Sequence, residues 1–507
     1  MENFCDKMID DLLLFCRSHK RVYLYGAGIF AARYRAILEK LGQRVSGCFV
    51  SNGNDKKWHG LSVSAYSKGG KKLDSEDGII LALSENKHND VIDLLNGICI
   101  DIWKESNENI NFLYNKIVLI PIFRSVATEC QYSIESLNNF KRILVIRTDV
   151  LGDLLMTIPF LRELKRNAPN AEIDMVIRDS NKFLMRNCPY ISRLIIFSPS
   201  NSDEIDLAKL EKFSKLNFSN RNYDVVFLPR VMLVGRNYTE NDILGMLCGA
   251  KYRVGRLLAY CDDFNDSSKQ EELYKLLQPF FTKLFWQAEP RHEVEYMLEL
   301  VKGCGGSIVD DRLEYWLTDA SKKFADECWS THKISVQAVC LAIGLVSKSP
   351  NRTWSAEHYA EFCRIIHDFD SNIFFILIGG DDAKNHAKEL SVYPNIVDLT
   401  GKTHLDQAAA CIAKCRLYVG ANTGLMHLAA ALHKPVVEIS AWLPDGSPLH
   451  GIAPLRMGAW GVHMRLCQPK KGKDDCRGAC NKSYAHCIND ISAGLVARNV
   501  ISLIESM

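Results

Sequence analysis

Two aspartates flank a glycine in residues 147–153 (RTDVLGD), directly after an apolar run that is typical of a buried strand. Asp153 is expected at the start of the next helix, where the positive end of the helix dipole favours a carboxylate. One interpretation is structural: Asp149 or Asp153 caps this helix. The other is a general base, which must stay ionised and which a helix N-terminus helps to keep ionised. Spacing alone favours the two equally.

A second glycine-containing turn lies at 420–424, between an apolar strand and an alanine-rich helix. Backbone N–H groups near Thr423 and Gly424, together with the threonine hydroxyl, would form an anion site at the helix N-terminus. Such turns are also common without a ligand, and His427 alone is more typical of a half-buried structural histidine than of a catalyst. This turn is therefore one of two candidate sites for a phosphate.

The other candidate is a polar loop after a third apolar strand, which contains Lys348 and Arg352. Either cation could reach a diphosphate, and arginine offers a fixed fork of donors that suits phosphate oxygens. The alternative is that both are solvated loop charges. Gly380, after the next strand, is expected at the same edge of the sheet, where it would help to shape a nucleotide pocket.

Cysteines gather near the C-terminus, and two histidines lie beside them. Thiolate clusters can hold zinc or iron, which would be structural here and not needed for chemistry. The spacing lacks a Cys-x-x-Cys pair, so ordinary buried cysteines are the alternative. The candidate residues are Cys467, Cys476, Cys480 and Cys487, with His463 and His486 as neighbours.

The elements that must position these residues repeat one order three times: an apolar strand, a glycine-containing turn and a helical pattern. Continuous apolar strands alternating with helices predict parallel sheets covered on both faces. We therefore predict an α/β protein with two facing Rossmann-like lobes, 141–330 and 331–507, preceded by a smaller Rossmann-like domain, 1–125. The strand ends would meet at the cleft between the lobes, where open α/β sheets bind ligands.

The first domain contains Gly26-x-Gly28-x-x-Ala31 after a strand, a near match to the dinucleotide fingerprint. The acidic residue expected at the end of the second strand is missing, since that strand ends Phe49-Val50-Ser51-Asn52. The missing carboxylate weakens an NAD site. A structural, acceptor-recruiting or oligomerising role is favoured over cofactor binding.

The composition is that of an ordinary globular protein. Of 507 residues, 24% are charged and 47% hydrophobic, and the formal net charge of +2 gives no reason to expect a nucleic-acid partner. No apolar stretch has the length of a signal peptide core or a membrane span. The cysteines lack the spacing of a secreted disulfide framework, so a cytoplasmic location is expected.

Several motifs together resemble the ADP-heptose:lipopolysaccharide heptosyltransferase family, also called glycosyltransferase family nine. They run in the family's order from Lys141 to the end of the chain: KRILVIRTDVLGDLLMTIPFLRELKRNAPNAEIDMVI, YDVVFLPR, LCGAKYRVGR, RHEVEYMLELVKGCG, SPNRTWSAEHYAEFC and LTGKTHLDQAAACIAKCRLYVGANTGLMHLAAALHKPVVEIS. The resemblance implies a two-lobed (GT-B type), metal-independent, inverting glycosyltransferase.

The resemblance also implies roles for single residues. Asp153 takes the place of the family's general base, and Arg352 the place where the family usually has a lysine that contacts the donor diphosphate. Thr423 and Gly424 match the phosphate-contacting loop, and His427 the histidine that follows it. Where the family commonly has aspartate this chain has Asn422, which puts the exact donor sugar in doubt. The remaining residues that we assign to the donor site are Thr148, Gly152, Lys348 and Gly380.

The resulting expectation is a bacterial enzyme that moves heptose from ADP-heptose onto lipopolysaccharide or another cell-envelope glycan. It would need no cofactor beyond the nucleotide-sugar co-substrate, and would reach its acceptor through peripheral contact with the inner membrane surface. Two alternatives stay open: a sugar-nucleotide epimerase, and a non-catalytic carbohydrate-binding or scaffold protein in which Asn422 marks a decayed site.

Overall fold

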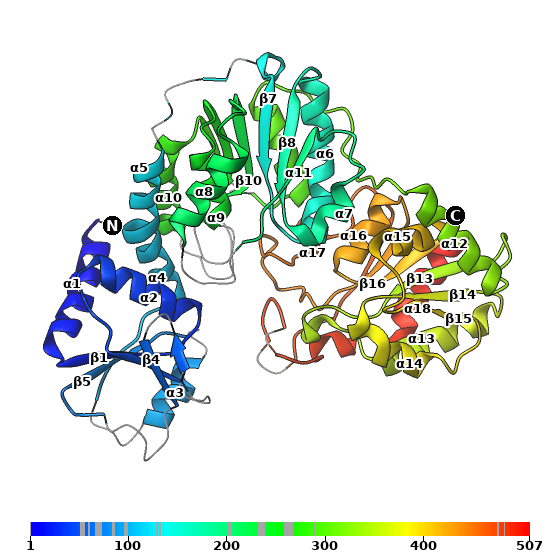
Figure 1. The fold of residues 1–507 in the computed structure, drawn as a ribbon. Helices are drawn as coiled ribbons and strands as arrows, with labels where there is room; N and C mark the ends of the chain where they lie inside the picture. The colour runs from blue at the N-terminus through cyan, green and yellow to red at the C-terminus, as the bar shows by residue number, and fades with distance from the viewer. Residues whose placement is uncertain are drawn as a thin grey trace. The chain divides into compact units, whose positions relative to one another are not determined.

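The structure of the chain, a computed structural model, is drawn in Figure 1. It describes residues 2–50, 56–58, 61–65, 73–83, 87–95, 100–127, 130, 133–134, 136–199, 205–231, 239–257, 267–286, 289–473, 476–480 and 482–506. The chain forms two compact units: the first combines Met1–Ser133 with Pro199–Trp286, and the second combines Ile134–Ser198 with Gln287–Met507.

The first unit begins with a six-stranded sheet in the order β3-β4-β2-β1-β5-β6. Neighbouring strands pair in parallel except β3 and β4, which are antiparallel. The strands are β1 (Arg21–Tyr25), β2 (Gly47–Val50), β3 (Lys56–Trp58), β4 (Leu61–Ala65), β5 (Asp77–Leu81) and β6 (Asp101–Trp103). The helices of this part are α1 (Glu2–Ser18), α2 (Ile29–Lys40), α3 (His88–Leu95), α4 (Asn107–Tyr114), the π-helix η2 (Asn115–Leu119) and α5 (Ile120–Val126).

The strand–turn–helix predicted around the first glycine fingerprint is present. Four of the five residues of β1 are buried, and α2 follows the turn with Gly28 as its N-cap. Ser51 and Asn52, where the sequence lacks the acidic residue of a dinucleotide site, lie outside the described residues. A cofactor role for this domain therefore gains no support.

Three more strands of the first unit pair in parallel in the order β12-β11-β10. The elements here are α8 (Leu207–Asn217), β10 (Val225–Val231), α9 (Thr239–Leu247), β11 (Tyr252–Leu257), α10 (Ser267–Leu277), the 3-10 helix η5 (Gln278–Phe280) and β12 (Lys283–Trp286). The sequence pattern predicts a helical stretch over roughly 271–302, which is wrong in part because the strand β12 lies between α10 and the next helix. The four residues of β12 (KLFW) are too few to show strand alternation, and their aromatic side chains favour a pleated sheet.

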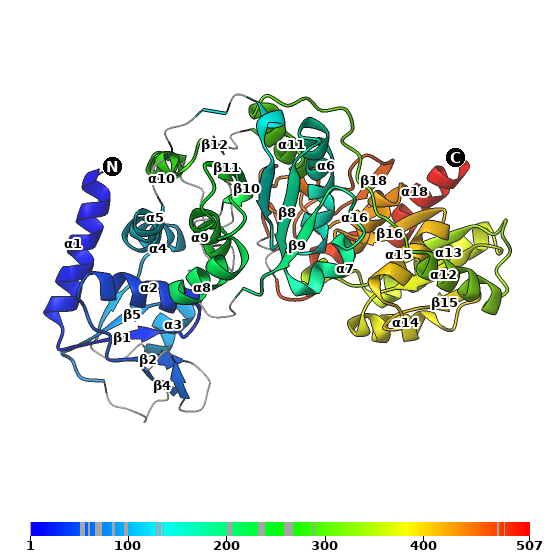
Figure 2. The ribbon, with the colours of Figure 1, turned by 45° about the horizontal axis from the view of Figure 1, so that its top comes forward.

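In the second unit, β7, β8 and β9 pair in parallel. The elements around them are the 3-10 helix η3 (Leu137–Asn139), β7 (Arg142–Ile146), α6 (Leu151–Asn167), β8 (Glu172–Ile177), the 3-10 helix η4 (Asp179–Asn181), α7 (Lys182–Met185), β9 (Arg193–Ile196), α11 (Glu293–Gly303) and α12 (Asp319–Thr331). Helix α6 packs against α11 (Figure 2). Its apolar side chains are almost all buried, and each contributes about 1.5–3 kcal/mol of hydrophobic stabilisation.

A third sheet completes the second unit, with all neighbours parallel in the order β15-β14-β13-β16-β17-β18. Its strands are β13 (Cys340–Gly344), β14 (Phe374–Ile378), β15 (Ile396–Asp398), β16 (Leu417–Ala421), β17 (Val436–Ile439) and β18 (Met464–Cys467). Its helices are η6 (Pro350–Arg352), α13 (Ala356–Phe369), η7 (Asp381–Ala383), α14 (Lys384–Leu390), α15 (Leu405–Lys414), α16 (Gly424–Ala431), α17 (Pro454–Met457), η8 (Cys487–Asp490) and α18 (Ala493–Glu505).

The strand register of the third sheet sets the position of the candidate site. Gly344 at the end of β13 pairs with Ile378 of β14 on one side and Gly420 of β16 on the other, and Gly420 pairs with Glu438 of β17. The loops that leave these strands therefore emerge side by side at one edge of the sheet. This is the edge at which open parallel sheets bind ligands.

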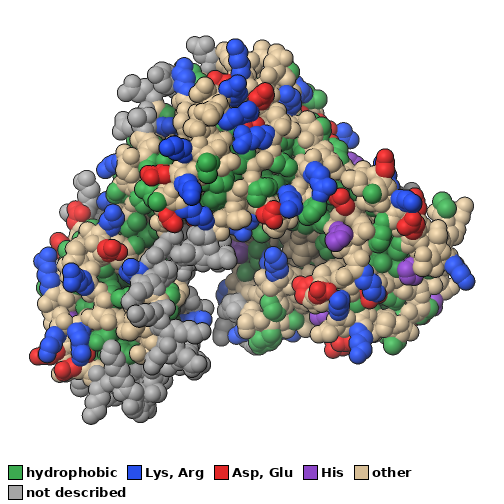
Figure 3. Space-filling model, viewed as in Figure 1, with side chains coloured by type: hydrophobic (Ala, Val, Ile, Leu, Met, Phe, Trp, Pro, Cys, Tyr) green, Lys and Arg blue, Asp and Glu red, His purple; other side chains and the backbone are tan. Residues whose placement is uncertain are grey.

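The predicted α/β class, with three mainly parallel sheets, is confirmed. The domain boundaries at 125, 141 and 330 stay a prediction. Among the described residues, no helix combines the length and apolar character needed to cross a bilayer. Acidic and basic side chains both occur across the face in Figure 3, in keeping with the net charge of +2.

Candidate active site

The general-base candidate, Asp153, lies in the first turn of α6, and the residue is only 6% exposed. The N-cap of α6 is Val150, which makes no side-chain capping bond. The N-cap residue is therefore neither Asp149 nor Asp153, and both the structural role and the general-base role of these aspartates stay predictions. Thr148, which we assigned to the donor side, is fully buried beneath this turn.

One buried guanidinium group holds the carboxylates of this region together. Arg147 Nε lies 2.6 Å from Asp149 Oδ2, and Arg147 Nη2 lies 3.5 Å from Asp153 Oδ1. The same Nη2 lies 3.4 Å from Oε1 of Glu293, and Arg456 Nη2 lies 3.4 Å from the other oxygen, Oε2. Two guanidinium groups thus lie among three carboxylates away from water, and the contact with Arg147 restrains the Asp153 side chain.

Glu293 is the first residue of α11, and the residue before it, His292, holds the start of this helix in place. His292 is the N-cap of α11 and forms a capping box with Glu295. Its Nε2 donates to the Gly458 carbonyl at 3.0 Å, and its ring stacks on Trp460 with centroids 4.4 Å apart. Burial lowers the pKa of His292, so this capping imidazole is neutral near pH 7.

The first turns of α6 and α16 lie directly against each other. A Cβ atom at Gly152 would stand 2.6 Å from Cδ2 of His427, and one at Gly424 would stand 2.7 Å from Cδ2 of Leu151. A side chain at either glycine would collide with the His427 ring or with the Leu151 side chain. The structure therefore brings the Asp153 turn and the predicted phosphate turn together.

His427 is buried at this contact, and its Nδ1 has no hydrogen-bond partner among the described residues. Burial, followed by the charge of His292, lowers the pKa of His427 to about 3. The imidazole is therefore neutral at physiological pH. It can offer one N–H donor or one lone pair to a ligand, but no positive charge.

Asn422 has a fixed orientation at the end of β16. Its Nδ2 donates both to Glu438 Oε1 at 3.2 Å and to the Met457 carbonyl at 2.7 Å. Both amide protons are thereby used, which leaves Oδ1 as an acceptor for a ligand hydroxyl. Glu438 is fully buried; burial raises its pKa to about 7, against the opposing effect of hydrogen bonds from Asn422 and Ser440.

The loop after β13 supplies a cation. Arg352 lies in η6, and its Nη2 donates to Ser349 Oγ at 3.0 Å. Among the described residues no carboxylate pairs with this half-buried guanidinium, and burial lowers its pKa. An anionic ligand would supply the missing counter-charge. Lys348 in the same loop is exposed, as is Gly380 at the end of β14.

The C-terminal cysteines come together only in part. Cys476, Cys480 and Cys487 lie beside His486, whereas Cys467 lies apart, with its Sγ accepting from Asn499 Nδ2 at 3.4 Å. The sequence analysis proposed the four cysteines as a set and treated His486 as a neighbour. In the structure the fourth member of the cluster is His486, and Cys467, at the end of strand β18, lies outside it.

Five residues of the site were given no role in the sequence analysis: Arg147, His292, Glu293, Glu438 and Arg456. Their common signal is a charged or polar side chain inside an otherwise apolar segment, which is rare in a core unless the group is paired. The pairs that join Arg147 to Glu293, Glu293 to Arg456 and His292 to Gly458 span well over 100 residues each, so these pairings could not be predicted.

Two protein families match the chain. Residues 283–441 match glycosyltransferase family 9 (heptosyltransferase), and residues 104–196 match thioredoxin. The second range contains Cys130 and Cys188 but no Cys-x-x-Cys pair, so it lacks a thioredoxin-like redox motif. Residues 283–441 thus match the family that the motifs resemble.

Individual relatives agree with this match. Lipopolysaccharide heptosyltransferase 3 of Escherichia coli K12 is 23% identical over 306 residues, which is 57% of this chain and 79% of the relative. Among solved structures, the glycosyltransferase family 9 protein of Veillonella parvula aligns with a TM-score of 0.59 at 20% identity, over 72% of this chain and 98% of that one. ADP-heptose lipopolysaccharide heptosyltransferase II of E. coli aligns with a TM-score of 0.53 at 19% identity, over 72% of this chain and 99% of that one.

Proposed function

We propose that this chain, whose residues 283–441 match glycosyltransferase family 9, transfers heptose from ADP-heptose to a lipopolysaccharide acceptor with inversion at the anomeric carbon. The observation that supports this most is the contact between the first turns of α6 and α16. It sets a fixed carboxylate beside a helix N-terminus suited to phosphate. A nucleophile and a leaving group would meet at such a place.

In the proposed reaction, Asp153 takes the proton from an acceptor hydroxyl as that oxygen attacks the anomeric carbon. The new bond joins the acceptor oxygen to this carbon, while the bond to the diphosphate oxygen breaks on the opposite face. Arg147 touches no substrate in this account; its ion pairs hold Asp153 in position. A general base of this kind contributes about 10²–10⁴-fold to the rate.

The departing diphosphate gains negative charge, and three features favour it. The N–H groups at Thr423 and Gly424 lie at the start of helix α16. Arg352 lacks a carboxylate partner among the described residues. The turn at Thr423 and the loop that contains Arg352 follow β16 and β13, which are neighbouring strands of one sheet. Neutral His427 adds a hydrogen-bond donor without a charge. Charge stabilisation of this kind is often the largest single contribution to catalysis.

The sugar or ribose hydroxyls would donate to Oδ1 of Asn422. The family commonly has aspartate here, and Asn422 donates from Nδ2 to Glu438 and to the Met457 carbonyl. Because both amide protons are used, the change from Asp to Asn keeps an acceptor oxygen and removes a charge. Thr148, Gly152, Lys348 and Gly380 would line the same donor site.

We propose a cytoplasmic location, with peripheral contact to the inner membrane where lipid-linked acceptors are held. The 1–125 domain would serve recruitment of the acceptor or oligomerisation. Neither the membrane contact nor the role of the 1–125 domain involves a nucleic-acid partner.

Release of ADP from ADP-heptose, with and without a truncated lipopolysaccharide acceptor, tests the function. The proposal predicts release that depends on the acceptor and a product heavier by one heptose. Conversion of the donor to a new sugar nucleotide without acceptor would instead indicate an epimerase. No binding of any nucleotide sugar in a thermal-shift assay would indicate a non-catalytic protein, since a ligand that binds the native state stabilises it.

A further inference from the structure

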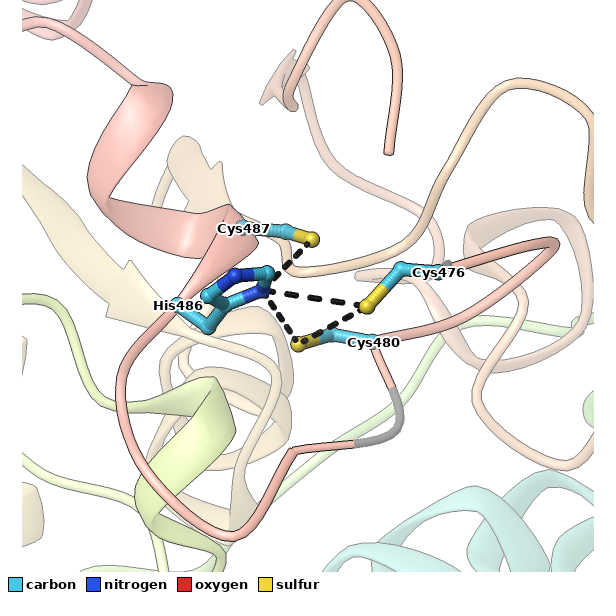
Figure 4. A group of neighbouring side chains, drawn as sticks. All are labelled: Cys476, Cys480, His486 and Cys487. Carbon is cyan, nitrogen blue, oxygen red and sulfur yellow. Dashed lines mark hydrogen bonds between the residues drawn. The ribbon is translucent and has the colours of Figure 1, made fainter. Parts of the chain in front are cut away.

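Three thiols and one imidazole meet in the segment between β18 and α18 (Figure 4). Nδ1 of His486 lies 3.7 Å from Sγ of Cys476, 3.7 Å from Sγ of Cys480 and 3.3 Å from Sγ of Cys487. The sulfurs of Cys476 and Cys480 are 4.0 Å apart, and all four atoms lie within 4.8 Å of one another. The four side chains thus point at one small volume.

The four distances given above are close to the edges of a metal-centred tetrahedron. With metal–sulfur bonds of about 2.3 Å and a metal–nitrogen bond of about 2.0 Å, tetrahedral geometry places two sulfurs about 3.8 Å apart and each sulfur about 3.5 Å from the nitrogen. A disulfide needs sulfurs about 2.05 Å apart. The Cys476 and Cys480 sulfurs are far beyond that separation, so the observed spacing fits metal ligands better than a disulfide.

The surroundings also suit a thiolate site. The four residues are between 0 and 9% exposed, and the backbone N–H of Lys473 donates to Sγ of Cys487 at 3.5 Å. Donors of this kind orient metal-bound ligands. The buried apolar group here consists of the three cysteines and Leu443, which is little hydrophobic core for an irregular segment. A bound ion would supply the missing folding free energy.

The segment is tied to two loops at the ligand-binding edge of the third sheet. Asn351, next to Arg352 in η6, donates from Nδ2 to the Cys480 carbonyl at 2.8 Å. On the other side, the Leu443 N–H donates to the Gly478 carbonyl at 3.2 Å, and the Gly478 N–H donates to Asp445 Oδ1 at 3.1 Å. Order in this segment therefore supports the loops that follow β13 and β17.

We propose that Cys476, Cys480, His486 and Cys487 bind one divalent transition-metal ion, zinc or iron, and that this ion fixes the loop that carries Arg352. Thiolate and imidazole ligands in a tetrahedron select these metals over magnesium or calcium. The ion is structural, because all four coordination positions are filled by protein. The metal site stands without the proposed transferase function; only its effect on Arg352 rests on that function.

Metal analysis of the full-length protein, purified under reducing conditions without chelators, tests the site. We expect about one equivalent of zinc or iron per chain, as a closed four-ligand site requires. The metal content of Cys480→Ser should be at least tenfold lower than that of the wild type. Cys467→Ser is the matched control: Cys467 is also a buried cysteine but lies outside the cluster, and this variant should keep its metal.

The wild type alone can overturn the site, even if a variant fails to fold. A chain that binds neither zinc nor ferrous iron after anaerobic incubation contradicts it, as does equal metal in Cys480→Ser and Cys467→Ser. Replacement by Co²⁺ gives a second readout, since three thiolate ligands should produce an intense sulfur-to-cobalt charge-transfer band. Absence of that band in cobalt-loaded protein excludes thiolate coordination.

The effect on the loop is tested by ADP titration before and after metal removal. We expect affinity for ADP to fall at least tenfold in metal-free protein and to recover when zinc or iron is restored. Unchanged affinity would overturn the link to Arg352 while leaving the metal site intact. A metal-loaded wild type that binds no nucleotide at all would count against the proposed function and not against the site.

Discussion

At the residue scale, Arg147 shows how one buried cation can organise a reacting group. It contacts Asp149, Asp153 and Glu293, and Arg456 balances the second oxygen of Glu293. Buried ion pairs add little net stability, but removal of one partner is costly because it leaves a charge without compensation. We infer that this network serves to position Asp153 more than to stabilise the fold.

Asn422→Asp tests the orientation of the amide. The variant would lose both donated hydrogen bonds and place a second carboxylate beside Glu438. We expect a loss of about 1–3 kcal/mol in the free energy of unfolding, measured with urea at pH 8. Asn385→Asp, on the exposed side of α14, is the control and should change little. Equal stability of the two variants would show that these hydrogen bonds do not hold Asn422.

Two buried groups make stability depend on pH in opposite directions. The pKa of Glu438 is raised to about 7 in the fold, so its contribution is complete below its unfolded value near 4.5 and is lost as pH rises through 7. The pKa of His427 is lowered to about 3, so its contribution is present above 6.5 and is lost as pH falls toward 3.

Glu438→Gln separates the two effects. It should flatten the decline in unfolding free energy between about pH 4.5 and 7, because glutamine does not titrate. The loss of stability toward acid pH, which belongs to His427, should persist. Urea denaturation at several pH values measures the unfolding free energy in both pH ranges. An unchanged profile in the variant would mean that Glu438 does not titrate in this range.

At the element scale, the site depends on the close packing of α6 on α16. Gly152→Ala would put a methyl group within 2.6 Å of the His427 ring, on a helix backbone that cannot yield freely. We expect a loss of about 1–3 kcal/mol in unfolding free energy and slower turnover, because Asp153 moves with the turn.

Gly494→Ala is the matched control for this prediction. Gly494 also lies in the first turn of a helix, α18, and its nearest neighbour is the end of the Arg498 side chain at 3.7 Å. This variant should be neutral or slightly stabilising, because alanine is the better helix former. A Gly152→Ala protein as stable and active as the Gly494→Ala protein would contradict close packing at the site.

The elements around α6 and α16 were predictable because their signals are local: an apolar strand, a glycine turn and a helical period. The brief strand β12 was missed because four residues carry no period. The partners Glu293 and Arg456 were missed because their contacts with the Asp153 region span most of the second unit's sequence. The replacement of Cys467 by His486 in the cysteine cluster could not be predicted either, because it depends on where β18 ends.

At the scale of the whole molecule, 72% of the chain resembles in fold a glycosyltransferase family 9 protein and, separately, a heptosyltransferase. The motifs predicted this part in order, from the base candidate to the phosphate turn. The 1–125 domain has no such support, and its recruiting or oligomerising role stays a proposal. Acceptor choice also stays open, because irregular loops carry no periodic signal in a single sequence.

The central claim is that Asp153 activates the acceptor for attack on a nucleotide sugar. Acceptor-dependent release of ADP from ADP-heptose by Asp153→Asn, compared with Asp179→Asn at the exposed start of η4, measures this most directly. We predict that Asp153→Asn loses about 10²–10⁴-fold in kcat and keeps its thermal shift with ADP, while Asp179→Asn stays near wild type. Near-normal turnover of Asp153→Asn would contradict the account.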